Sequence, residues 1–433
     1  MVSRVAMLSL HSSPLDQPGS GSSGGMNVYV RELAQALAAE DLAIDIFTRS
    51  ADVKRIVEEQ RGVRVIALPA GPTGPVAKHA LVDLAPALLH GIDSFAQGEG
   101  NGYDIVHSHY WISGLVARRL AQRWSVPMVH MFHTLSRVKS HFGGATEDLQ
   151  RAAGEQRVLD AADVIVVPNS IEASQLRALY DVRGAHLATI PCGIDPAPFG
   201  AQSQQSPGCA AVLPAALGGP CPRPVPGCIV PETGQPSPHF VVLALGRIER
   251  LKNFALLLQA TAIACARDPQ FAAQVRVRIA GGPSSDEPEV LLQLKRQASD
   301  LGITKQVSFL GPVPHSAVPE LYAGADLCVV PSHHESFGLV ALEAMAARLP
   351  VIATAVGGLQ VTVADEITGY LVQPNDAEAM AQRMLTLWSS PCLREAMGMR
   401  GARAAQHYAW PVIGERVRCL YESVAQSRKM AWS

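Results

Sequence analysis

One stretch near the C-terminal end limits the fold more than any other. Four apolar residues, Leu327 to Val330, lead into Pro331 and a polar loop. A short apolar run that stops at a proline is typical of a buried strand. From Phe337 onward, apolar side chains recur at helical spacing, at Leu339, Leu342 and Met345. The stretch therefore predicts a buried strand, a loop and a helix in direct succession.

The start of this helix favours binding of an anion. The first N–H groups of a helix have no partner within it, and the helix dipole is positive there. Glu335 precedes the helix and Glu343 lies inside it. Two carboxylates beside such a site cannot both serve the anion, so they suit the hydroxyl groups of a sugar attached to a phosphate. An ordinary strand–loop–helix packing unit is the alternative interpretation.

The remaining sequence predicts two α/β domains, because 433 residues exceed what one core usually holds. In the first domain, residues 1–200, strand-like apolar runs lie at 5–10, 43–47, 63–68, 104–107, 127–132, 164–167 and 187–191. Segments of helical pattern alternate with them, at 80–90, 114–123 and 145–163. This alternation predicts a parallel sheet covered on both faces.

Residues 239–410 repeat the pattern and form the second predicted domain. Its strands are expected at 240–245, 275–280, 307–310, 327–330, 351–355 and 369–372, with helices between them, such as 255–266 and 289–298. Between the domains, residues 201–238 are rich in Gly, Pro, Ser and Gln and have no period. Such composition is typical of a disordered insertion. A last helix is expected over 411–426.

Two basic residues follow the first strand of the second domain. Arg247 and Lys252 lie five positions apart, so the loop must fold back for them to converge. At the carboxyl end of a strand, two cations suit a diphosphate, with Arg as a fork and Lys as a point charge. Exposed basic residues without a ligand are the alternative interpretation.

Two histidines lie at the end of a strand in the first domain. A histidine in this position could bond a sugar hydroxyl or move a proton. His109, the later of the two, is the candidate for such a role, whereas His107 is expected to have a structural role. A buried histidine without a function is the alternative for each.

A glycine-rich loop follows the first strand of the chain. Strand, glycine-rich loop and helix form the opening of a doubly wound domain. The spacing differs from Gly-x-Gly-x-x-Gly, so a dinucleotide fingerprint is not indicated. Gly24 and Gly25 instead allow close approach of the backbone to a ligand. A Gly/Ser linker is the alternative interpretation.

Two of these motifs resemble one known family. The run from Glu335 to Glu343 is similar to Glu-x-Phe-Gly-Leu-x-x-x-Glu, the donor signature of family 4 of the glycosyltransferases. Arg247 and Lys252 resemble the Gly-Arg-x-x-x-x-Lys donor clamp of that family. The resemblance implies an α/β fold of the GT-B class, with two Rossmann-like doubly wound domains facing a cleft. The C-terminal helix, within 411–433 here, would cross back to the first domain.

The resemblance also implies an activity and roles for single residues. It implies a retaining transferase that takes a sugar from a nucleotide sugar, with no cofactor required for catalysis. Catalytic roles fall on His109, Arg247, Lys252 and Glu335. Donor contacts fall on Gln17, Pro18, Gly25, Arg247, Lys252, Val313, Glu335, Ser336, Phe337, Gly338, Leu339 and Glu343.

Within the family, the chain is most similar to the inositol-phosphate transferases of mycothiol synthesis, which use UDP-N-acetylglucosamine. This likeness implies a small phosphorylated acceptor, 1D-myo-inositol 3-phosphate. Acceptor contacts fall on His11, Ser22, Ser23, Gly24, Gly25, Met26, Asn27, Lys78, Tyr110, Thr134 and Arg151. The subgroup has Asp-Ala where this chain has Ser22 and Ser23, which allows a changed acceptor that keeps its phosphate.

The subgroup also binds a magnesium ion through backbone oxygens. The matching positions are Tyr322, Ala323 and Ala325. A further metal-associated threonine of the subgroup is Leu349 in this chain. This substitution weakens the expectation of a magnesium site.

Composition argues against several classes of partner. The net charge is −2 and there is no long basic run, which argues against nucleic acid or an anionic membrane surface. The N-terminal apolar run stops at His11, too early for a span or a signal segment, so we expect a cytoplasmic protein without a transmembrane segment. No two of the eight cysteines have Cys-x-x-Cys spacing, which argues against zinc or redox motifs. The oligomeric state stays open, a homodimer included.

Three other functions stay open at this point. One is a family 4 enzyme with another acceptor, such as a sucrose-phosphate-type or lipid-linked-sugar transferase. The others are a nucleotide-sugar epimerase and a nucleotide-sugar-binding protein without catalysis. Neither of these two needs an acceptor site, so Lys78, Thr134 and Arg151 argue against them. The donor base, the sugar and the acceptor follow from the resemblance alone.

Overall fold

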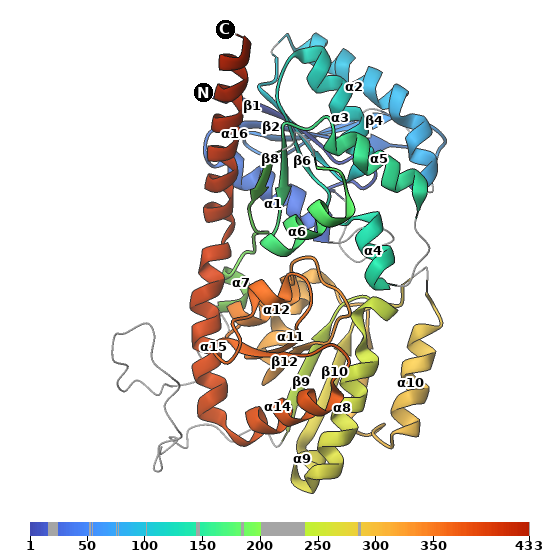
Figure 1. The fold of residues 1–433 in the computed structure, drawn as a ribbon, viewed down its shortest axis with the longest axis vertical. Helices are drawn as coiled ribbons and strands as arrows, with labels where there is room; N and C mark the ends of the chain where they lie inside the picture. Colours follow the sequence, from blue (N-terminus) through green and yellow to red (C-terminus); the bar gives the residue numbers. More distant parts are fainter. Residues whose placement is uncertain are drawn as a thin grey trace, which may run out of the picture.

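The computed structural model describes residues 1–15, 25–51, 53, 55–74, 76, 78–100, 102–143, 148–182, 186–200, 239–284 and 287–432. Some predicted features lie outside these residues, namely Gln17, Pro18, Ser22, Ser23, Gly24 and the 201–238 insertion. The chain folds into two α/β domains, each built on one sheet, and Figure 1 shows them stacked one above the other. This confirms the predicted fold class.

The first domain contains an eight-stranded sheet in the order β3-β4-β2-β1-β5-β6-β7-β8. Its strands are β1 (Arg4–Leu8), β2 (Ala43–Ser50), β3 (Arg55–Gln60), β4 (Val63–Pro69), β5 (Ile105–His109), β6 (Met128–Met131), β7 (Val164–Val167) and β8 (His186–Thr189). The central strands β5, β6 and β7 are buried along their whole length. Burial on both faces is typical of parallel strands with helices on either side.

The predicted helical segments 80–90, 114–123 and 145–163 of the first domain each overlap an observed helix, although the ends differ. The observed helices are α1 (Gly25–Ala38), the 3₁₀ helix η1 (Lys78–Leu84), α2 (Ala85–Glu99), α3 (Trp111–Trp124), α4 (Ser136–Gly143), α5 (Leu149–Leu159), α6 (Ser170–Leu179) and the short α7 (Ala197–Gly200). The predicted helix over 145–163 contains α5, which begins at Leu149 and ends earlier than predicted, at Leu159. The predicted parallel sheet is confirmed, with one addition: the edge strand β3, which was not predicted, pairs antiparallel with β4.

The second domain contains a six-stranded sheet in the order β11-β10-β9-β12-β13-β14, and every pair is parallel. Its strands are β9 (Phe240–Leu245), β10 (Val275–Ala280), β11 (Val307–Gly311), β12 (Leu327–Val330), β13 (Val351–Thr354) and β14 (Gly369–Val372). Its helices are α8 (Phe254–Arg267), α9 (Pro269–Gln274), α10 (Val290–Asp300), α11 (Val318–Ala323), α12 (Leu339–Ala346), α13 (Leu359–Thr362), α14 (Ala377–Ser389) and α15 (Pro391–Ala405). Short 3₁₀ turns lie at η3 (Arg250–Lys252), η4 (His315–Ala317) and η5 (Gln406–Tyr408).

Helix α12 begins two residues later than predicted. It starts at Leu339, because Gly338 has a left-handed backbone with φ of 93° and cannot continue a right-handed helix toward Phe337. Phe337 and Gly338 therefore belong to the loop that follows β12.

The last helix, α16 (Trp410–Trp432), crosses from the second domain back to the first. In Figure 1, α15 runs beside the second domain and α16 continues beside the first, where it packs against α1. The Tyr421 hydroxyl lies 2.6 Å from Nδ1 of His107, and Arg428 forms an ion pair of 3.0 Å with Asp163. The predicted crossing is confirmed.

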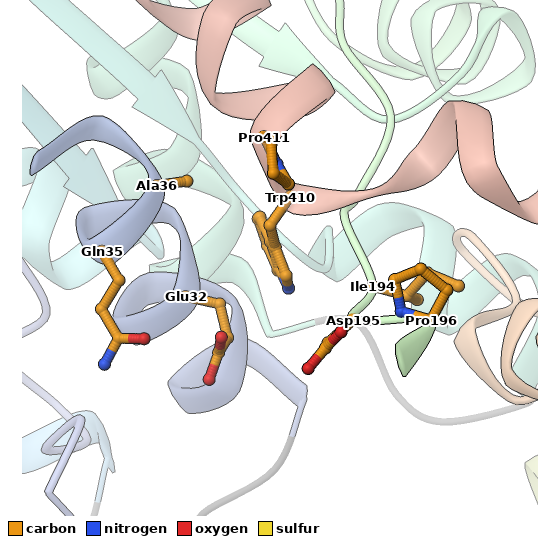
Figure 2. A pocket seen from close by; sticks show the side chains of 8 residues that line it. All are labelled: Glu32, Gln35, Ala36, Ile194, Asp195, Pro196, Trp410 and Pro411. Carbon is orange, nitrogen blue, oxygen red and sulfur yellow. The ribbon is translucent and has the colours of Figure 1, made fainter. Parts of the chain in front are cut away.

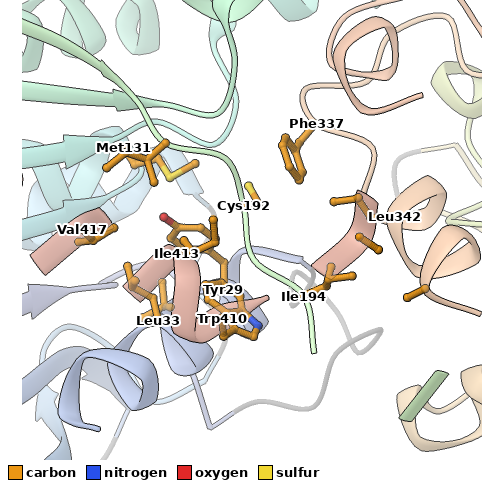
Figure 3. Packing of buried hydrophobic residues seen from close by; sticks show 14 of the residues in the cluster. Tyr29, Leu33, Met131, Cys192, Ile194, Phe337, Leu342, Trp410, Ile413 and Val417 are labelled. Atoms are coloured by element: carbon orange, nitrogen blue, oxygen red, sulfur yellow. The ribbon is translucent and has the colours of Figure 1, made fainter. Parts of the chain in front are cut away.

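A single apolar cluster joins the two domains (Figure 3). Tyr29 and Leu33 of α1 pack with Trp410 and Ile413 of α16, and the cluster continues to Phe337 of the second domain. Each domain has a further apolar cluster of its own on the other face of its sheet. None of the helices in the described ranges combines the length and the apolar character that a membrane span requires.

Candidate functional site

The carboxyl ends of the two parallel sheets approach each other where α1 and α12 begin. A Cβ atom built on Gly25 would lie 3.6 Å from Cδ1 of Leu339. These residues open α1 of the first domain and α12 of the second. Two helix N-termini, each predicted to contact the donor, therefore lie in contact across the domain interface.

The loop between β12 and α12 is held rigidly by its backbone carbonyls. The N–H of Gly358 donates to the Glu335 carbonyl at 2.7 Å, and the Thr362 hydroxyl donates to the Phe337 carbonyl at 2.7 Å. The Ser336 carbonyl, between them, accepts from the side-chain amide of Asn169 in the first domain, at 2.6 Å. We call residues Glu335–Leu339 the donor loop.

Gly357 and Gly358 complete this arrangement. A Cβ on Gly357 would lie 2.1 Å from the Glu335 carbonyl oxygen, and one on Gly358 would lie 2.4 Å from that of Ser336. Only glycine allows so close an approach of two backbones. The helix behind the loop has no side-chain cap, so the first N–H groups of α12 keep the capacity to bind an anion.

Of the two predicted cations, Lys252 reaches the donor loop and Arg247 stays at the surface. The Lys252 ammonium forms a 2.6 Å ion pair with the Glu335 carboxylate, and each side chain is about one-fifth exposed. The Arg247 side chain is 66% exposed and lies 3.7 Å from Glu249. An arriving diphosphate would meet one cation already held in place and one free to turn toward it.

The two glutamates of the donor signature differ in environment. Glu335 is paired with Lys252, whereas Glu343 accepts a hydrogen bond of 3.0 Å from the hydroxyl of the buried Tyr322. Burial raises the pKa of the Glu343 carboxyl to about 7. Near neutral pH, the Glu343 carboxyl is therefore partly protonated.

Glycines line the neighbouring strand ends of the second domain. Gly246, Gly281 and Gly311 end β9, β10 and β11 with positive φ. A Cβ on Gly281 would lie 1.8 Å from the carbonyl oxygen of Gly246. The half-buried Val313, a predicted donor contact, follows this edge. Sequence reasoning missed Gly281, although its place directly after an apolar strand marks it.

In the first domain, His107 and His109 of β5 and His130 of β6 are buried, and the half-buried His133 follows β6. Nδ1 of His109 lies 3.0 Å from Nε2 of His133, and the rings of His107 and His109 are 4.3 Å apart. Burial lowers the pKa of His107 and of His133 to about 3, and it also holds the pKa of His109 and of His130 well below the usual value. These imidazoles are therefore neutral. Nε2 of His109 is buried and has no hydrogen-bond partner among the described residues, which is unusual for a buried polar atom.

His133 is a site residue that sequence reasoning missed. It follows β6 in a left-handed backbone conformation with φ of 62°, which is rare for a residue with a side chain and often marks a functional position. The ring of Tyr29 meets the rings of both His109 and His133 edge-on. The available signal was its position at a strand end, the same position that marked His109.

Three of the four residues predicted to bind the acceptor phosphate converge. The Arg151 guanidinium donates to the Thr134 hydroxyl at 2.9 Å and lies 5.0 Å above the Tyr110 ring. The His11 ring lies 4.1 Å from that of Tyr110. Lys78 begins η1, and its side chain lies outside the described atoms.

Arg151 is also tied to a buried carboxylate. Its Nε atom donates to Glu155 at 2.7 Å, and the Glu155 side chain is fully buried. The hydroxyl of Tyr180 and the backbone N–H of Ser136 donate to the same carboxylate. The guanidinium is therefore fixed in place before any acceptor arrives.

Two other predicted acceptor residues lie in α1. Asn27 is buried, and its side-chain amide makes two hydrogen bonds to the loop after β1. Its Oδ1 accepts from the Ser12 hydroxyl at 2.8 Å, and its Nδ2 donates to the Ser13 carbonyl at 2.6 Å. Met26 is half-buried against the apolar core. The contacts of Asn27 fix the position of the loop that carries His11.

The positions matched to a magnesium site fit that ion poorly. The carbonyl of Tyr322 already accepts the N–H of Ala325 at 3.1 Å, and Leu349 is a buried apolar side chain without an oxygen. Magnesium prefers carboxylate and water ligands in octahedral geometry. Among the described residues, no group of three or more His, Cys, Asp or Glu side chains could hold a metal ion. Ala323 and Ala325 offer only backbone oxygens.

A pocket lies at the hinge between the domains (Figure 2). Its volume is about 210 Å³, and Trp410 of α16 stands between α1 and the linker that contains Asp195. None of the predicted donor or acceptor residues lines it.

Two family models match the chain and together cover most of it. A model described as glycosyl transferase 4-like domain matches residues 24–193, and one described as glycosyl transferases group 1 matches residues 229–404. The chain is 39% identical over 446 residues to a D-inositol 3-phosphate glycosyltransferase of Kineococcus radiotolerans, covering 99% of this chain and 97% of that one. It is 40% identical to the protein of that name from Saccharomonospora viridis, covering 94% and 91%.

Solved structures agree with the fold. A sucrose-phosphate synthase from Thermosynechococcus elongatus superposes with a TM-score of 0.80 at 30% identity, covering 98% of this chain and all of that one. The HepE protein of Anabaena, solved in complex with UDP-glucose, gives a TM-score of 0.67 at 20% identity, covering 97% and 99%. The two domains and the C-terminal helix α16 therefore have the arrangement of a known enzyme fold.

Proposed function

The chain belongs to the group 1, family 4 glycosyltransferases, and we propose from this premise that it glycosylates a phosphorylated polyol. We infer that the sugar is N-acetylglucosamine, that the donor is UDP-N-acetylglucosamine and that the acceptor is 1D-myo-inositol 3-phosphate. The names of relatives that are 39–40% identical over nearly the whole chain support this choice.

The observation that carries the proposal is the convergence of Tyr110, Thr134 and Arg151. They come from three separate segments, and the guanidinium of Arg151 contacts both other residues. A fixed guanidinium with the Thr134 hydroxyl and the Tyr110 ring beside it suits a phosphate dianion, because Arg binds phosphate as a rigid fork. A neutral sugar would not require a cation at this position.

On the donor side, the diphosphate would lie between the donor loop and the cations Lys252 and Arg247. The loop N–H groups and the two cations would stabilise negative charge that develops on the leaving diphosphate, which is electrostatic catalysis. Transfer on the front face, with the leaving diphosphate taking the acceptor proton, is the mechanism proposed for this chain. His109, neutral and with Nε2 available, would hydrogen-bond the sugar or the acceptor.

The decisive experiment is product analysis with a matrix of substrates. UDP-, GDP- and ADP-sugars are each offered with inositol, inositol 3-phosphate and fructose 6-phosphate. We expect product from UDP-N-acetylglucosamine with inositol 3-phosphate, and none with free inositol. Equal use of free inositol would contradict the phosphate assignment, and absence of transfer with every pair would contradict catalysis.

A second candidate is transfer to a sugar phosphate. The 30% identity with a sucrose-phosphate synthase over nearly the whole chain favours it, as does the Ser22-Ser23 substitution in the acceptor loop. The fructose 6-phosphate column of the same matrix separates the two candidates.

A further inference from the structure

Asn169 is a buried residue of the first domain that contacts the donor loop of the second. It follows β7 and is the N-cap of α6, with only 1% of its surface exposed. The sequence offers no sign of a role beyond that cap, since Asn is a common N-cap residue.

The two polar atoms of the Asn169 side chain make hydrogen bonds to different domains. Its Oδ1 accepts the N–H of Glu172 at 2.9 Å, which caps α6. Its Nδ2 donates to the Ser336 carbonyl at 2.6 Å, across the domain interface and 167 positions along the chain. Asn is the residue that supplies an acceptor and a donor at this spacing, because Asp, Ser and Thr can cap a helix but cannot present the NH₂ group.

Fixing the Ser336 carbonyl also fixes the following N–H. The peptide unit is planar and trans, so the N–H of Phe337 must point away from Asn169, opposite to the Ser336 carbonyl. The carbonyls on either side, those of Glu335 and Phe337, are bonded within the second domain, to Gly358 and Thr362. The middle peptide of the three is the one held from the other domain.

The bond is not needed to hold the domains together. The apolar cluster shared by α1, α16 and the start of α12 already joins them. A single hydrogen bond adds little to such an interface. Its specific effect is on the direction of one peptide at the predicted donor site.

We propose that Asn169 is a positioning residue for the donor: it orients the Phe337 N–H toward the donor diphosphate and so makes donor binding depend on contact between the domains. The inference rests on the proposed function, because it requires a nucleotide sugar at the donor loop. Preorganised backbone donors lower the barrier for charge that develops on a leaving group, and they lose this effect when misplaced by a fraction of an ångström.

The test is Asn169→Asp, which keeps the shape and the Oδ1 cap but replaces the NH₂ group with an oxygen that repels the Ser336 carbonyl. Asn169→Ser keeps a cap and loses the donor without adding charge. At pH 8, we expect kcat/KM for the nucleotide sugar to fall roughly tenfold to a hundredfold in both variants. The KM for the acceptor should stay close to wild type in both variants, and at pH 8 the melting temperature should fall less in Asn169→Ser than in Asn169→Asp, whose charged carboxylate is buried.

A pH profile distinguishes positioning from a purely structural role. A buried carboxyl beside a carbonyl oxygen has a raised pKa, and once protonated it can donate the missing hydrogen bond. The defect of Asn169→Asp should therefore shrink from pH 8 to pH 6, while that of Asn169→Ser should not. Asp376→Asn, the reverse exchange at the N-cap of α14, is the matched control for the cost of changing a cap.

Each outcome decides the question. Unchanged kcat/KM in both Asn169 variants, with active wild type, overturns the inference alone. A loss of activity that follows a lowered melting temperature, with no recovery toward pH 6, also overturns it by assigning Asn169 a structural role. Absence of transfer and of UDP binding in wild type instead contradicts the proposed function.

Discussion

The two sheet edges that meet at the domain interface differ in how they carry charge. The edge of the first domain consists of buried neutral imidazoles and an arginine already bonded to Glu155 and Thr134. The edge of the second domain consists of backbone N–H groups with two partly exposed cations, of which Arg247 has only a distant partner. The first edge is fixed before a ligand arrives, and the second edge can rearrange its charges around one.

Burial is the cause of this difference. Removal from water disfavours the charged form of a histidine, so the first edge offers neutral hydrogen-bonding groups. On the second edge, Lys252 and Glu335 keep about one-fifth of their surface in water, where the ion pair is weaker and salt screens it. Separation of Lys252 from Glu335 should therefore cost little.

The largest expected effect tests how rigid the first edge is. Arg151→Ala leaves the buried Glu155 carboxylate without its cation, and removal of one partner from a buried pair costs about 3–5 kcal/mol. We expect a loss of this size in the free energy of unfolding, measured by urea denaturation. The preference for inositol phosphate over inositol should fall as well.

A second substitution separates these two effects. Glu155→Gln in the Arg151→Ala background removes the stranded charge, so stability should recover while the preference for phosphate should not. Arg157→Ala, at an exposed position of the same helix, is the control and should change neither. Recovery of the phosphate preference in the double variant would remove Arg151 from the acceptor site.

The next effect concerns the charges of the second edge. Lys252→Ala and Arg247→Ala should each weaken UDP binding by about 1.5–3 kcal/mol, the range for hydrogen bonds to charged groups. Isothermal calorimetry at low and high salt measures this loss. Arg250→Ala is the matched control, because Arg250 lies in the same loop but points to Glu289. Equal affinity in the Lys252 and Arg247 variants would show that these cations do not bind the diphosphate.

The sequence predicted a region well where its structure depends on the local pattern of residues, and less well where it depends on contacts with distant segments. Strands such as β7 and β9 were predicted at their observed bounds, because strands buried on both faces have continuous apolar sequences. Strand β3 was missed, since an edge strand that contains Glu58, Glu59 and Gln60 lacks such a run. The convergence of Tyr110, Thr134 and Arg151 was anticipated from strand ends and from resemblance.

The contacts between domains could not be predicted in this way. Asn169 and Ser336 lie far apart in sequence, and nothing in the local pattern of either residue indicates the other. The same holds for Gly357 and Gly358, whose close approach to the donor loop depends on the packing of α13 beside it. Local patterns specify elements and their ends, but the pairing of loops depends on the assembled fold.

A third prediction uses pH to measure the neutral histidines. The folded pKa of His107 is about 3, below the 6.5 of an unfolded chain, so the unfolded state binds the extra proton first as pH falls. Stability should therefore fall below pH 6.5, by about 2 kcal/mol at pH 5 for this one group. His107→Asn, which can still bond Tyr421, should reduce the fall measured by denaturant unfolding. His186→Asn, at a surface position, should leave the slope unchanged.

The smallest expected effect has the opposite sign and belongs to the second edge. The folded pKa of Glu343 is about 7, above the 4.5 of an unfolded chain, so here the folded state holds the proton longer as pH rises. Its carboxyl should lower stability by about 1 kcal/mol between pH 6 and pH 7, because one pKa unit corresponds to about 1.4 kcal/mol. Glu343→Gln keeps an oxygen that can accept from Tyr322 and has no proton to lose, so its stability relative to wild type should rise over this interval by the same amount. Glu378→Gln, at an exposed position of α14, is the control. If the stabilities of Glu343→Gln and of wild type change in parallel from pH 6 to pH 7, Glu343 does not titrate in this interval. The difference in pH response between the two edges would then come from the histidines alone.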